Sequence, residues 1–458
     1  MYKKISLNGA RNVHFIGIGG ISMSGFAEIL KREGFNVSGS DDNSTDITTR
    51  LKNLGITVSI PTSADNIRDD VDLVVYTAAI KPTNVEYNAA YIKGKHLMER
   101  AEFVGKILPA YENAICIAGT HGKTTTTSMV SEVLISAGLD PTISIGGHMN
   151  RGGMNYRVGE SSYFVLEACE YSNSFHHWHP QVGVILNMEA DHLDFFGSME
   201  NVTASFAKFA RNIRQGGTLV IGHDIPQLEN LVHGFECNIL TFGLTNGNFK
   251  ASGVKHSNEK TSFDVIYNEK TIAHIDLPMP GDYNILNALA TFAVAYALDV
   301  PPQEIAAALS NVMGIKRRFE YKGSYNGIDI VDDYAHHPTE IRACLAAARE
   351  KFDGKIVCIF QPHTYSRTKS LFREFAESFN DADEIIIAPI FAAREPSDPT
   401  ITPKMLADEI KSLGKNAMDI ENFDKAGKYL RETLIPHSLL ITMGAGDIYK
   451  VGESLLIL

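Results

Sequence analysis

One glycine-rich turn constrains what this chain can fold into more than any other feature of the sequence. The turn, Gly119-Thr-His-Gly-Lys-Thr-Thr125, follows an apolar run that starts after Asn113 and predicts a buried strand. After the turn, apolar residues recur at the spacing of one helix face, at Met129, Val130, Val133 and Leu134. This order predicts a phosphate-binding loop, because glycines let backbone N–H groups surround anionic oxygens and a helix N-terminus adds partial positive charge.

The polar residues of the turn suit a nucleoside triphosphate. We expect Lys123 to neutralise the β- and γ-phosphates and the Thr124 hydroxyl to bind Mg²⁺. The full P-loop pattern has a further glycine five residues before Gly122, where this chain has Ile117, so the loop is the shorter Gly-x-x-Gly-Lys-Thr form. The alternative is a glycine-rich turn that carries a solvated lysine.

Length and composition bound the remaining possibilities. A chain of 458 residues predicts three domains at about 150 residues each. We expect a cytoplasmic protein without a membrane partner, since no run is apolar enough for a signal peptide or a membrane span. The five cysteines lack Cys-x-x-Cys spacing, which suits buried thiols in a reducing compartment. The net charge of −12 argues against a nucleic-acid partner, and we expect a monomer or a weak homodimer.

The first hundred residues alternate strand and helix patterns, which predicts a doubly wound parallel sheet. A strand enters the glycine turn Gly17-Ile-Gly-Gly20, a helix follows from Ile21, and the acidic Asp41 comes some twenty residues later. This is close to a dinucleotide-binding fingerprint, but Ser22 stands where the third glycine belongs. We therefore expect the diphosphate of some nucleotide ligand here, with a purely structural turn as the alternative.

Three α/β domains are predicted along the chain. We expect a Rossmann-like domain over 1–109, a central P-loop ATPase-type domain over 110–313 and a Rossmann-like C-terminal domain over 314–458. The first boundary is placed in a linker-like patch at 106–113, and an antiparallel hairpin is expected over 263–277.

Polar residues follow two further strands of the central domain. Glu167 and Glu170 lie at the end of one strand, and Asn187 to Asp194 follow the next. Neighbouring parallel strands would bring both loops beside Lys123 and Thr124. Carboxylate and imidazole ligands near phosphates suit Mg²⁺. A solvated loop is the alternative for the Asp191-His-x-Asp194 group.

The C-terminal domain offers cations. Asp332 to Glu340 follow a strand and precede a helix, Lys316 to Glu320 supply fixed charges just before them, and Arg367 closes a further loop. An arginine that reaches a bound phosphate stabilises a transferring phosphoryl group. The alternative is a set of surface salt bridges.

Together these segments resemble the Mur ligase family, the ATP-dependent amide-forming enzymes of peptidoglycan synthesis, over essentially the whole chain. The matching motifs are Gly17-Ile-Gly-Gly-Ile-Ser-Met-Ser-Gly25, Gly119-Thr-His-Gly-Lys-Thr-Thr125, Glu167-Ala-Cys-Glu170, Asn187-x-x-x-Asp191-His192, Asn284-x-x-Asn287-Ala, Arg317-Arg318-Phe-Glu320 and Asp333-Tyr-Ala-His-His-Pro-Thr339. Five stretches favour the member that adds the first amino acid, L-alanine, to UDP-N-acetylmuramate. They are the first of these motifs, Arg100-Ala-Glu102, Gly314-Ile-Lys-Arg-Arg-Phe-Glu320, Gln361-Pro-His363 and Met443-Gly-Ala-Gly-Asp447.

The resemblance implies a role for each matching residue. The UDP-sugar would be bound by Gly17, Gly19, Gly20, Ser22, Met23, Asp41, Thr77, Ala78, Ile80, Asn150 and Arg151, with 148–151 near its lactyl carboxylate. ATP would be bound by Gly119, Thr120, His121, Gly122, Lys123, Thr124, Thr125, Asn287 at the adenine and Arg318 at the γ-phosphate. L-Alanine would contact Tyr334, His336 and Arg367, and Mg²⁺ would contact Thr124, Glu170 and His192. The catalytic group would be Lys123, Glu170, His192 and Arg318.

The chain departs from the family pattern at two places. Cys169 stands where the family often has aspartate, and Thr364 where arginine is common, so one contact to the amino-acid carboxylate is missing. Lys208 is a candidate for the lysine that is carbamylated in sibling ligases.

The implied reaction needs no protein nucleophile. A carboxylate would attack the γ-phosphorus, and alanine would then displace phosphate from the resulting acyl phosphate, with domain closure excluding water. Because we expect the loop to be exposed, we predict that Lys123→Ala abolishes ADP formation but not folding. The alternatives are a ligase that joins a tripeptide to UDP-N-acetylmuramate in cell-wall recycling, an NAD-dependent dehydrogenase, and a nucleotide-operated switch.

Overall fold

The computed structural model describes residues 4–147, 155–257, 260–393 and 395–457. Its contacts divide the chain into two compact units. The first unit holds Met1–Lys250, Tyr267–Glu269 and Asn287–Ala308, and the second holds Ala251–Ile266, Lys270–Leu286 and Leu309–Leu458. Three sheets run through the described residues, and the fold is the expected three-domain α/β arrangement. In the described chain no helix is both long and apolar enough to cross a membrane.

The first sheet forms an N-terminal lobe, by which we mean the part of the first unit that carries β1 to β5. Its strand order is β3-β2-β1-β4-β5 and every pair is parallel, so the predicted doubly wound topology is confirmed. The strands are β1 (Asn12–Ile16), β2 (Asn36–Ser40), β3 (Thr57–Ser59), β4 (Leu73–Tyr76) and β5 (His96–Glu99). The helices are α1 (Ile21–Arg32), α2 (Asp46–Asn53), α3 (Val85–Ile92) and α4 (Arg100–Ile107), with short 3₁₀ turns at Ala64–Asn66 and Leu108–Ala110.

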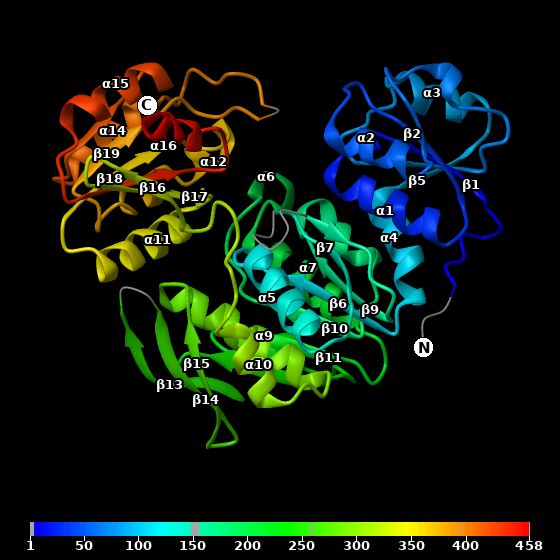
Figure 1. Cartoon of the computed structure of the whole chain (residues 1–458), viewed down its shortest axis with the longest axis horizontal. Coiled ribbons are helices and arrows are strands. Elements are labelled where there is room, and N and C mark those ends of the chain that lie inside the picture. The colour runs from blue at the N-terminus through cyan, green and yellow to red at the C-terminus, as the bar shows by residue number, and fades with distance from the viewer. Residues whose placement is uncertain (1–3, 148–154, 258–259, 394, 458) are drawn as a thin grey trace. The chain divides into compact units, whose positions relative to one another are not determined.

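The second sheet carries the phosphate-loop strand near its middle. Within the first unit its order is β12-β11-β10-β6-β9-β7-β8, parallel except for β8 against β7. The strands are β6 (Asn113–Ala118), β7 (Thr142–Ser144), β8 (Tyr156–Arg157), β9 (Tyr163–Glu167), β10 (Val182–Ile185), β11 (Thr218–Gly222) and β12 (Asn238–Gly243). The helices that follow are α5 (Lys123–Ser136), α6 (Leu193–Phe196), α7 (Met199–Arg211), α8 (Leu228–Val232), α9 (Asp282–Ala297) and α10 (Pro302–Leu309), with a 3₁₀ segment at Tyr171–His177 (Figure 1).

The predicted hairpin over 263–277 is confirmed. β14 (Thr261–Tyr267) and β15 (Lys270–Leu277) are neighbours in the sheet, after β13 (Phe249–His256). Their connection is the dipeptide Asn268-Glu269, and both residues have positive φ, at 49° and 60°. Two positive φ values are what a type I′ turn needs, and this turn matches the twist of paired strands.

The third sheet, in the second unit, has the order β16-β17-β21-β18-β19-β20, with only β16 antiparallel to its neighbour. The strands are β16 (Glu320–Tyr325), β17 (Ile328–Asp333), β18 (Lys355–Phe360), β19 (Glu384–Ile387), β20 (Ala417–Asp419) and β21 (Ser438–Met443). The helices are α11 (Pro338–Lys351), α12 (Tyr365–Ser370), α13 (Phe372–Ala376), α14 (Pro403–Ser412), α15 (Phe423–Thr433) and α16 (Tyr449–Leu456).

Helices cover both faces of this third sheet. Along β18, Cys358 and Phe360 join one core with residues of α11, α13 and α14, whereas Val357 and Ile359 join another with residues of α15 and α16. Strands covered on both faces are apolar throughout, which is why Lys355 to Phe360 shows no polar alternation.

The segment 106–113 is packed rather than linker-like. Leu108 and Tyr111 are buried in a core that also contains residues of the first and second sheets. Arg214 donates to the carbonyl oxygens of both residues, at 2.9 and 2.8 Å. An exposed linker would carry neither feature, so that part of the expectation is wrong, while the domain boundaries at 109/110 and 313/314 remain predictions.

Candidate functional site

The phosphate loop has the strand–turn–helix form that its sequence predicts. β6 ends at Ala118, Gly119 and Gly122 have φ of +144° and +82°, and α5 begins at Lys123. A Cβ on Gly119 would lie 2.9 Å from the Leu186 Cβ, and one on Gly122 would lie 2.5 Å from the Asn287 Oδ1. Both positions therefore require glycine, because the backbone is left-handed there and no side chain has room.

Lys123 is mostly buried and is paired with a carboxylate. Its Nζ donates to the carbonyl oxygens of Gly119 and Thr120 at 2.5 and 2.9 Å, and lies 3.0 Å from the Glu170 Oε2. The exposed fractions of the Lys123 and Glu170 side chains are 14% and 4%. Burial by itself lowers the Lys123 pKa, but the Glu170 carboxylate raises it further, so the net shift is upward. The expected exposure of the loop is thus wrong at Lys123, whereas the survival of folding in Lys123→Ala stays a prediction.

A second carboxylate meets the start of α5. Thr124 donates its hydroxyl to Glu167, 3.1 Å from either carboxylate oxygen, and the Gly146 amide donates to Glu167 Oε2 at 2.8 Å. Because β9 and β10 flank β6, the loops after them lie beside the phosphate loop, as expected. The sequence predicted Glu167 beside Thr124 as one of the carboxylates that suit Mg²⁺, although it was not among the three metal ligands that the family resemblance implied.

The loop after β10 holds the phosphate loop by hydrogen bonds; the sequence predicted that the two loops are neighbours but not these bonds. The Asn187 side chain accepts from the His121 amide at 2.8 Å and donates to the His121 carbonyl at 3.1 Å. The Asn187 carbonyl accepts from the Thr120 amide, and the Thr120 hydroxyl accepts from the Glu189 amide at 2.9 Å. The loop after β10 therefore fixes the backbone of the phosphate loop at Thr120 and His121 without any ligand.

Two other predicted site residues of the first unit lie in this neighbourhood. His192 has a left-handed backbone, its Nε2 lies 3.7 Å from the Asp191 Oδ2, and its ring centroid lies 4.8 Å from that of Tyr171, the residue after Glu170. Asn287 is buried, and its Oδ1 accepts from the Thr126 hydroxyl at 3.2 Å.

The N-terminal glycine turn lies where the strand order reverses. Gly17 follows β1 and the predicted residues Thr77, Ala78 and Ile80 follow β4, and β1 and β4 are neighbours that the chain leaves in opposite directions. In doubly wound sheets this switch point is where ligands bind. The α1 N-terminus has no side-chain cap, so its first amides face the turn.

Asp41 acts on the turn itself. Its Oδ2 accepts from the Gly19 amide at 3.0 Å, and a Cβ on Gly19 would come within 2.8 Å of that oxygen. Ser22 accepts from Arg100 at 3.2 Å, whereas the Met23 side chain is buried in the core, and its Cγ would lie 3.8 Å from a Cβ on Gly20 of the turn. The predicted residues Asn150 and Arg151 lie outside the described residues.

In the second unit, two arginines approach the end of β17. The Arg317 Nε donates to the Asp332 Oδ2 at 2.9 Å, and its Nη2 donates to the Gly444 carbonyl at 2.6 Å. The Arg318 Nη1 lies 3.8 Å from the Glu340 Oε1, and its guanidinium lies 5.3 Å from the Tyr334 ring centroid. Both arginines form ion pairs and are only partly exposed, so these pairs do not lie fully on the surface, and the role of the arginines at a phosphate stays a prediction.

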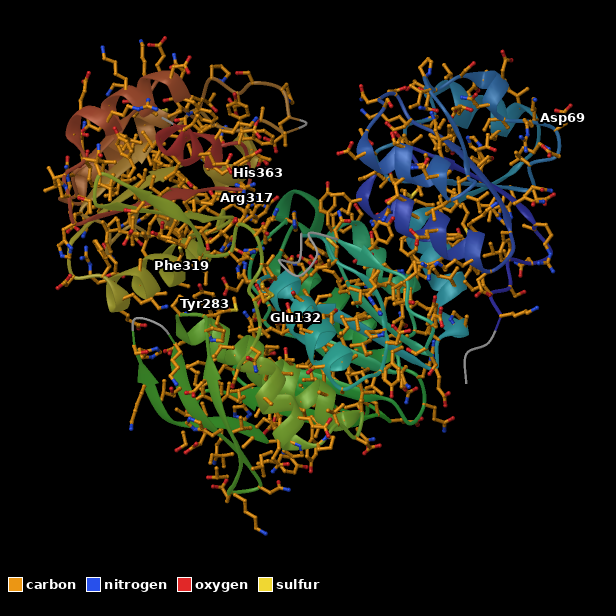
Figure 2. The ribbon with its side chains drawn as sticks, viewed as in Figure 1. Asp69, Glu132, Tyr283, Arg317, Phe319 and His363 are labelled. Carbon is orange, nitrogen blue, oxygen red and sulfur yellow. The ribbon has the colours of Figure 1, made fainter. Side chains whose placement is uncertain are left out.

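The predicted amino-acid residues are brought together at the same edge. The ring centroids of Tyr334 and His336 are 5.6 Å apart, and those of His336 and His363 are 5.8 Å apart. The Arg367 Nη1 donates to the His363 Nδ1 at 3.1 Å. β18 and β21 are neighbours, so Gln361-Pro-His363 lies beside the glycines after β21, and Figure 2 shows Arg317 and His363 on this edge.

Asp333 is the buried carboxylate beneath this edge. It accepts from the Phe319 and Ala335 amides, both at 2.7 Å. Burial raises the Asp333 pKa to about 6, although the Arg318 charge and the two amide bonds oppose the shift.

Three family models match the chain along almost its whole length. The Mur ligase family catalytic domain matches residues 12–112, the Mur ligase middle domain 117–295, and the Mur ligase glutamate ligase domain 317–446. The chain belongs to the Mur ligase family.

Individual members of the Mur ligase family are similar to this chain in sequence and in fold. A UDP-N-acetylmuramate–L-alanine ligase of Lachnospira eligens is 49% identical over 459 aligned residues, which cover 100% of both chains. The solved UDP-N-acetylmuramate–alanine ligase MurC of Thermotoga maritima is 31% identical, with a TM-score of 0.80 over 97% of this chain and 98% of its own. A murein peptide ligase of Psychrobacter arcticus shares the fold, with 24% identity and a TM-score of 0.68 over 97% and 98% of the two chains.

The structure also shows what surrounds the two departures from the Mur ligase pattern. Burial raises the Cys169 pKa to about 11, so its thiol stays protonated near neutral pH. Thr364 has φ of 66° and caps α12, accepting from the Arg367 amide at 3.4 Å. Its short hydroxyl is used within the chain, where the family pattern has a long cation.

Proposed function

We propose that this Mur ligase uses ATP to join L-alanine to the lactyl carboxylate of UDP-N-acetylmuramate. The reaction would be a step of peptidoglycan synthesis and would take place in the cytoplasm. The observation that carries the proposal is the 49% identity, over the whole length of both chains, to the L-alanine ligase of Lachnospira eligens. The phosphate loop and the glycine turn at a sheet switch point agree with it, because the two substrates carry a triphosphate and a diphosphate.

In this proposal the phosphate loop activates the carboxylate. Its amides and Lys123 bind the ATP phosphates, and a lactyl oxygen attacks the γ-phosphorus to give an acyl phosphate and ADP. Two anions must approach each other in this step, so neutralisation of charge lowers the barrier most. Lys123 already faces the loop carbonyls and Glu170, so its ammonium is held in place before the nucleotide binds.

Magnesium is part of the proposal, and the residues fit it. The Glu170 Oε2 is buried, with the Lys123 ammonium 3.0 Å away, and Glu167 and the Thr124 hydroxyl add further hard oxygen ligands. Thr124, Glu170 and His192 would hold the ion, with Glu167 as an added candidate. When bound, the ion would supply positive charge to the phosphates.

The second unit would bind alanine and the γ-phosphate. We propose that Arg367 pairs with the alanine carboxylate while Tyr334 and His336 enclose its small side chain, and that Arg318 binds the γ-phosphate. The bond from Arg367 to His363 limits the positions of the guanidinium, which lowers the entropy lost on binding. The free amine then attacks the acyl phosphate, forming the amide and releasing phosphate.

The direct test is product analysis by mass spectrometry after incubation with ATP, Mg²⁺, UDP-N-acetylmuramate, L-alanine and the tripeptide L-alanyl-γ-D-glutamyl-meso-diaminopimelate. We expect the alanyl adduct and an equal amount of ADP. A tripeptide adduct alone would assign the recycling ligase instead, and ADP formed without any adduct would indicate a nucleotide-operated switch. Chelation of Mg²⁺ by EDTA should abolish both products.

A further inference from the structure

A buried tyrosine joins the N-terminal lobe to the second sheet. The Tyr156 hydroxyl, on β8, donates to the Glu28 Oε2, on α1, at 3.0 Å. The two residues are only 7% and 8% exposed. Because α1 begins directly after the glycine turn, anything that fixes α1 also fixes that turn.

Two arginines and a glycine pack around the bond between Tyr156 and Glu28. The Arg32 Nη2 lies 3.2 Å from the Glu28 Oε1, the Arg50 Nη2 lies 3.5 Å from the Oε2, and the Arg50 guanidinium lies 4.5 Å from the Tyr156 ring centroid. A Cβ on Gly25 would lie 2.9 Å from the Tyr156 Cγ. The α1 backbone therefore rests directly on the ring, which gives a physical reason for the last glycine of the Gly17–Gly25 motif.

The strand pair β7–β8, which carries Tyr156, also connects to the phosphate loop. Tyr156 pairs with Ser144 across β7 and β8, and the Ile145 amide donates to the Asn155 carbonyl at 3.0 Å. The next residue, Gly146, donates to Glu167, which accepts from the Thr124 hydroxyl. A continuous series of contacts thus runs from α1 to the first turn of α5, all of it within the first unit.

We infer that Tyr156 and Glu28 are positioning residues for amide formation, because they hold the glycine turn that binds the UDP-sugar at a fixed distance from the phosphate loop. The inference rests on the proposed function. Attack on the γ-phosphorus needs near-attack geometry, and a misplacement of about 1 Å far from the chemistry can lower a rate by about 100-fold. Neither residue needs to touch a substrate to have this effect.

The test is Tyr156→Phe, which removes one hydroxyl and keeps the ring on Gly25. We expect kcat to fall about 10-fold, within the range that misplaced reactants produce. The dissociation constants of ATP and of UDP-N-acetylmuramate, measured separately by calorimetry, should stay within about two-fold, since no binding group is lost. Glu28→Gln keeps an oxygen that accepts from Tyr156 and should retain most of kcat, whereas Glu28→Leu should behave like Tyr156→Phe.

The matched control is Tyr91→Phe, since Tyr91 lies on α3 of the same lobe and is 72% exposed. It should leave kcat unchanged. A second readout needs no turnover: hydrogen exchange of the amides of 17–25 should become faster in Tyr156→Phe, while that of 119–125 stays as in the wild type.

A Tyr156→Phe enzyme with a lower melting temperature but wild-type kcat and wild-type exchange over 17–25 would overturn the inference, because the contact would then be structural only. A wild-type enzyme that made no amide product would refute the proposed function instead. The exchange measurement would still decide in that case whether Tyr156 holds the glycine turn.

Discussion

Replacing Lys123 by methionine separates the structural role of this residue from its chemical role. The ammonium lies 3.0 and 3.1 Å from the two oxygens of Glu170, and both side chains are largely buried. Removing one partner of a buried ion pair costs about 3–5 kcal/mol, because the other charge stays in a medium that solvates it poorly. We therefore expect Lys123→Met to lower the free energy of unfolding by about 3–5 kcal/mol.

A second substitution isolates this term. Glu170→Gln in the Lys123→Met background removes the stranded charge at nearly constant volume, so it should recover about 2 kcal/mol or more of the lost stability. The bonds from Lys123 to the Gly119 and Thr120 carbonyls are lost in both variants, so they cancel in the comparison. Both variants should lose at least about 10³-fold in ADP formation, because the phosphates lose a preorganised cation.

The assay is urea unfolding followed by the fluorescence of Trp178, with ADP release measured in parallel. Trp178 is the single tryptophan of the chain and is buried in the first unit, where its indole donates to the Ala101 carbonyl at 2.9 Å. If Lys123→Met had the wild-type free energy of unfolding, Lys123 and Glu170 would not form a buried ion pair. Substantial ADP release by the folded double variant would show that Lys123 does not act on the phosphates.

Three further outcomes are expected. Asn187→Ala removes both bonds to the His121 backbone and should raise the KM for ATP about 10-fold, with little change in the KM for UDP-N-acetylmuramate. Steady-state kinetics would measure both constants, and equal changes in the two would show that Asn187 does not act specifically on the ATP site. The raised Asp333 pKa, about 6 against 3.8, means that the folded state binds the proton more tightly, so the free energy of unfolding should fall by about 3 kcal/mol as pH rises from about 4 to 6 and then level off. Asp333→Asn should lack this fall in denaturation at matched pH values, and an identical profile would contradict the shift. Arg367→Lys should raise the KM for alanine most, because lysine cannot pair with a carboxylate through two bonds; a change confined to ATP would reassign the residue.

Much of the fold follows from local pattern. The apolar run before Gly119 and the helical spacing after Lys123 predicted β6 and α5, and the Asn268-Glu269 hairpin was predicted from its flanking strands. These elements can be predicted from the sequence because hydrogen bonds and side-chain periodicity within one helix or hairpin depend on neighbours a few residues away. The predicted linker at 106–113 failed because burial depends on distant partners such as Arg214.

Residue types and their spacing along the chain were enough to predict the candidate site residues: glycines at a strand end, a lysine and threonines at a helix start, and carboxylates and arginines after later strands. How these residues are held depends on contacts between distant parts of the chain. Lys123 meets Glu170, His121 meets Asn187, and Glu28 meets Tyr156 across 47, 66 and 128 positions of the chain. Contacts at such separations depend on strand order and helix packing, which local spacing does not encode. The burial of Lys123 and the hydrogen bonds from Asn187 to the phosphate loop therefore became visible only in the assembled sheets.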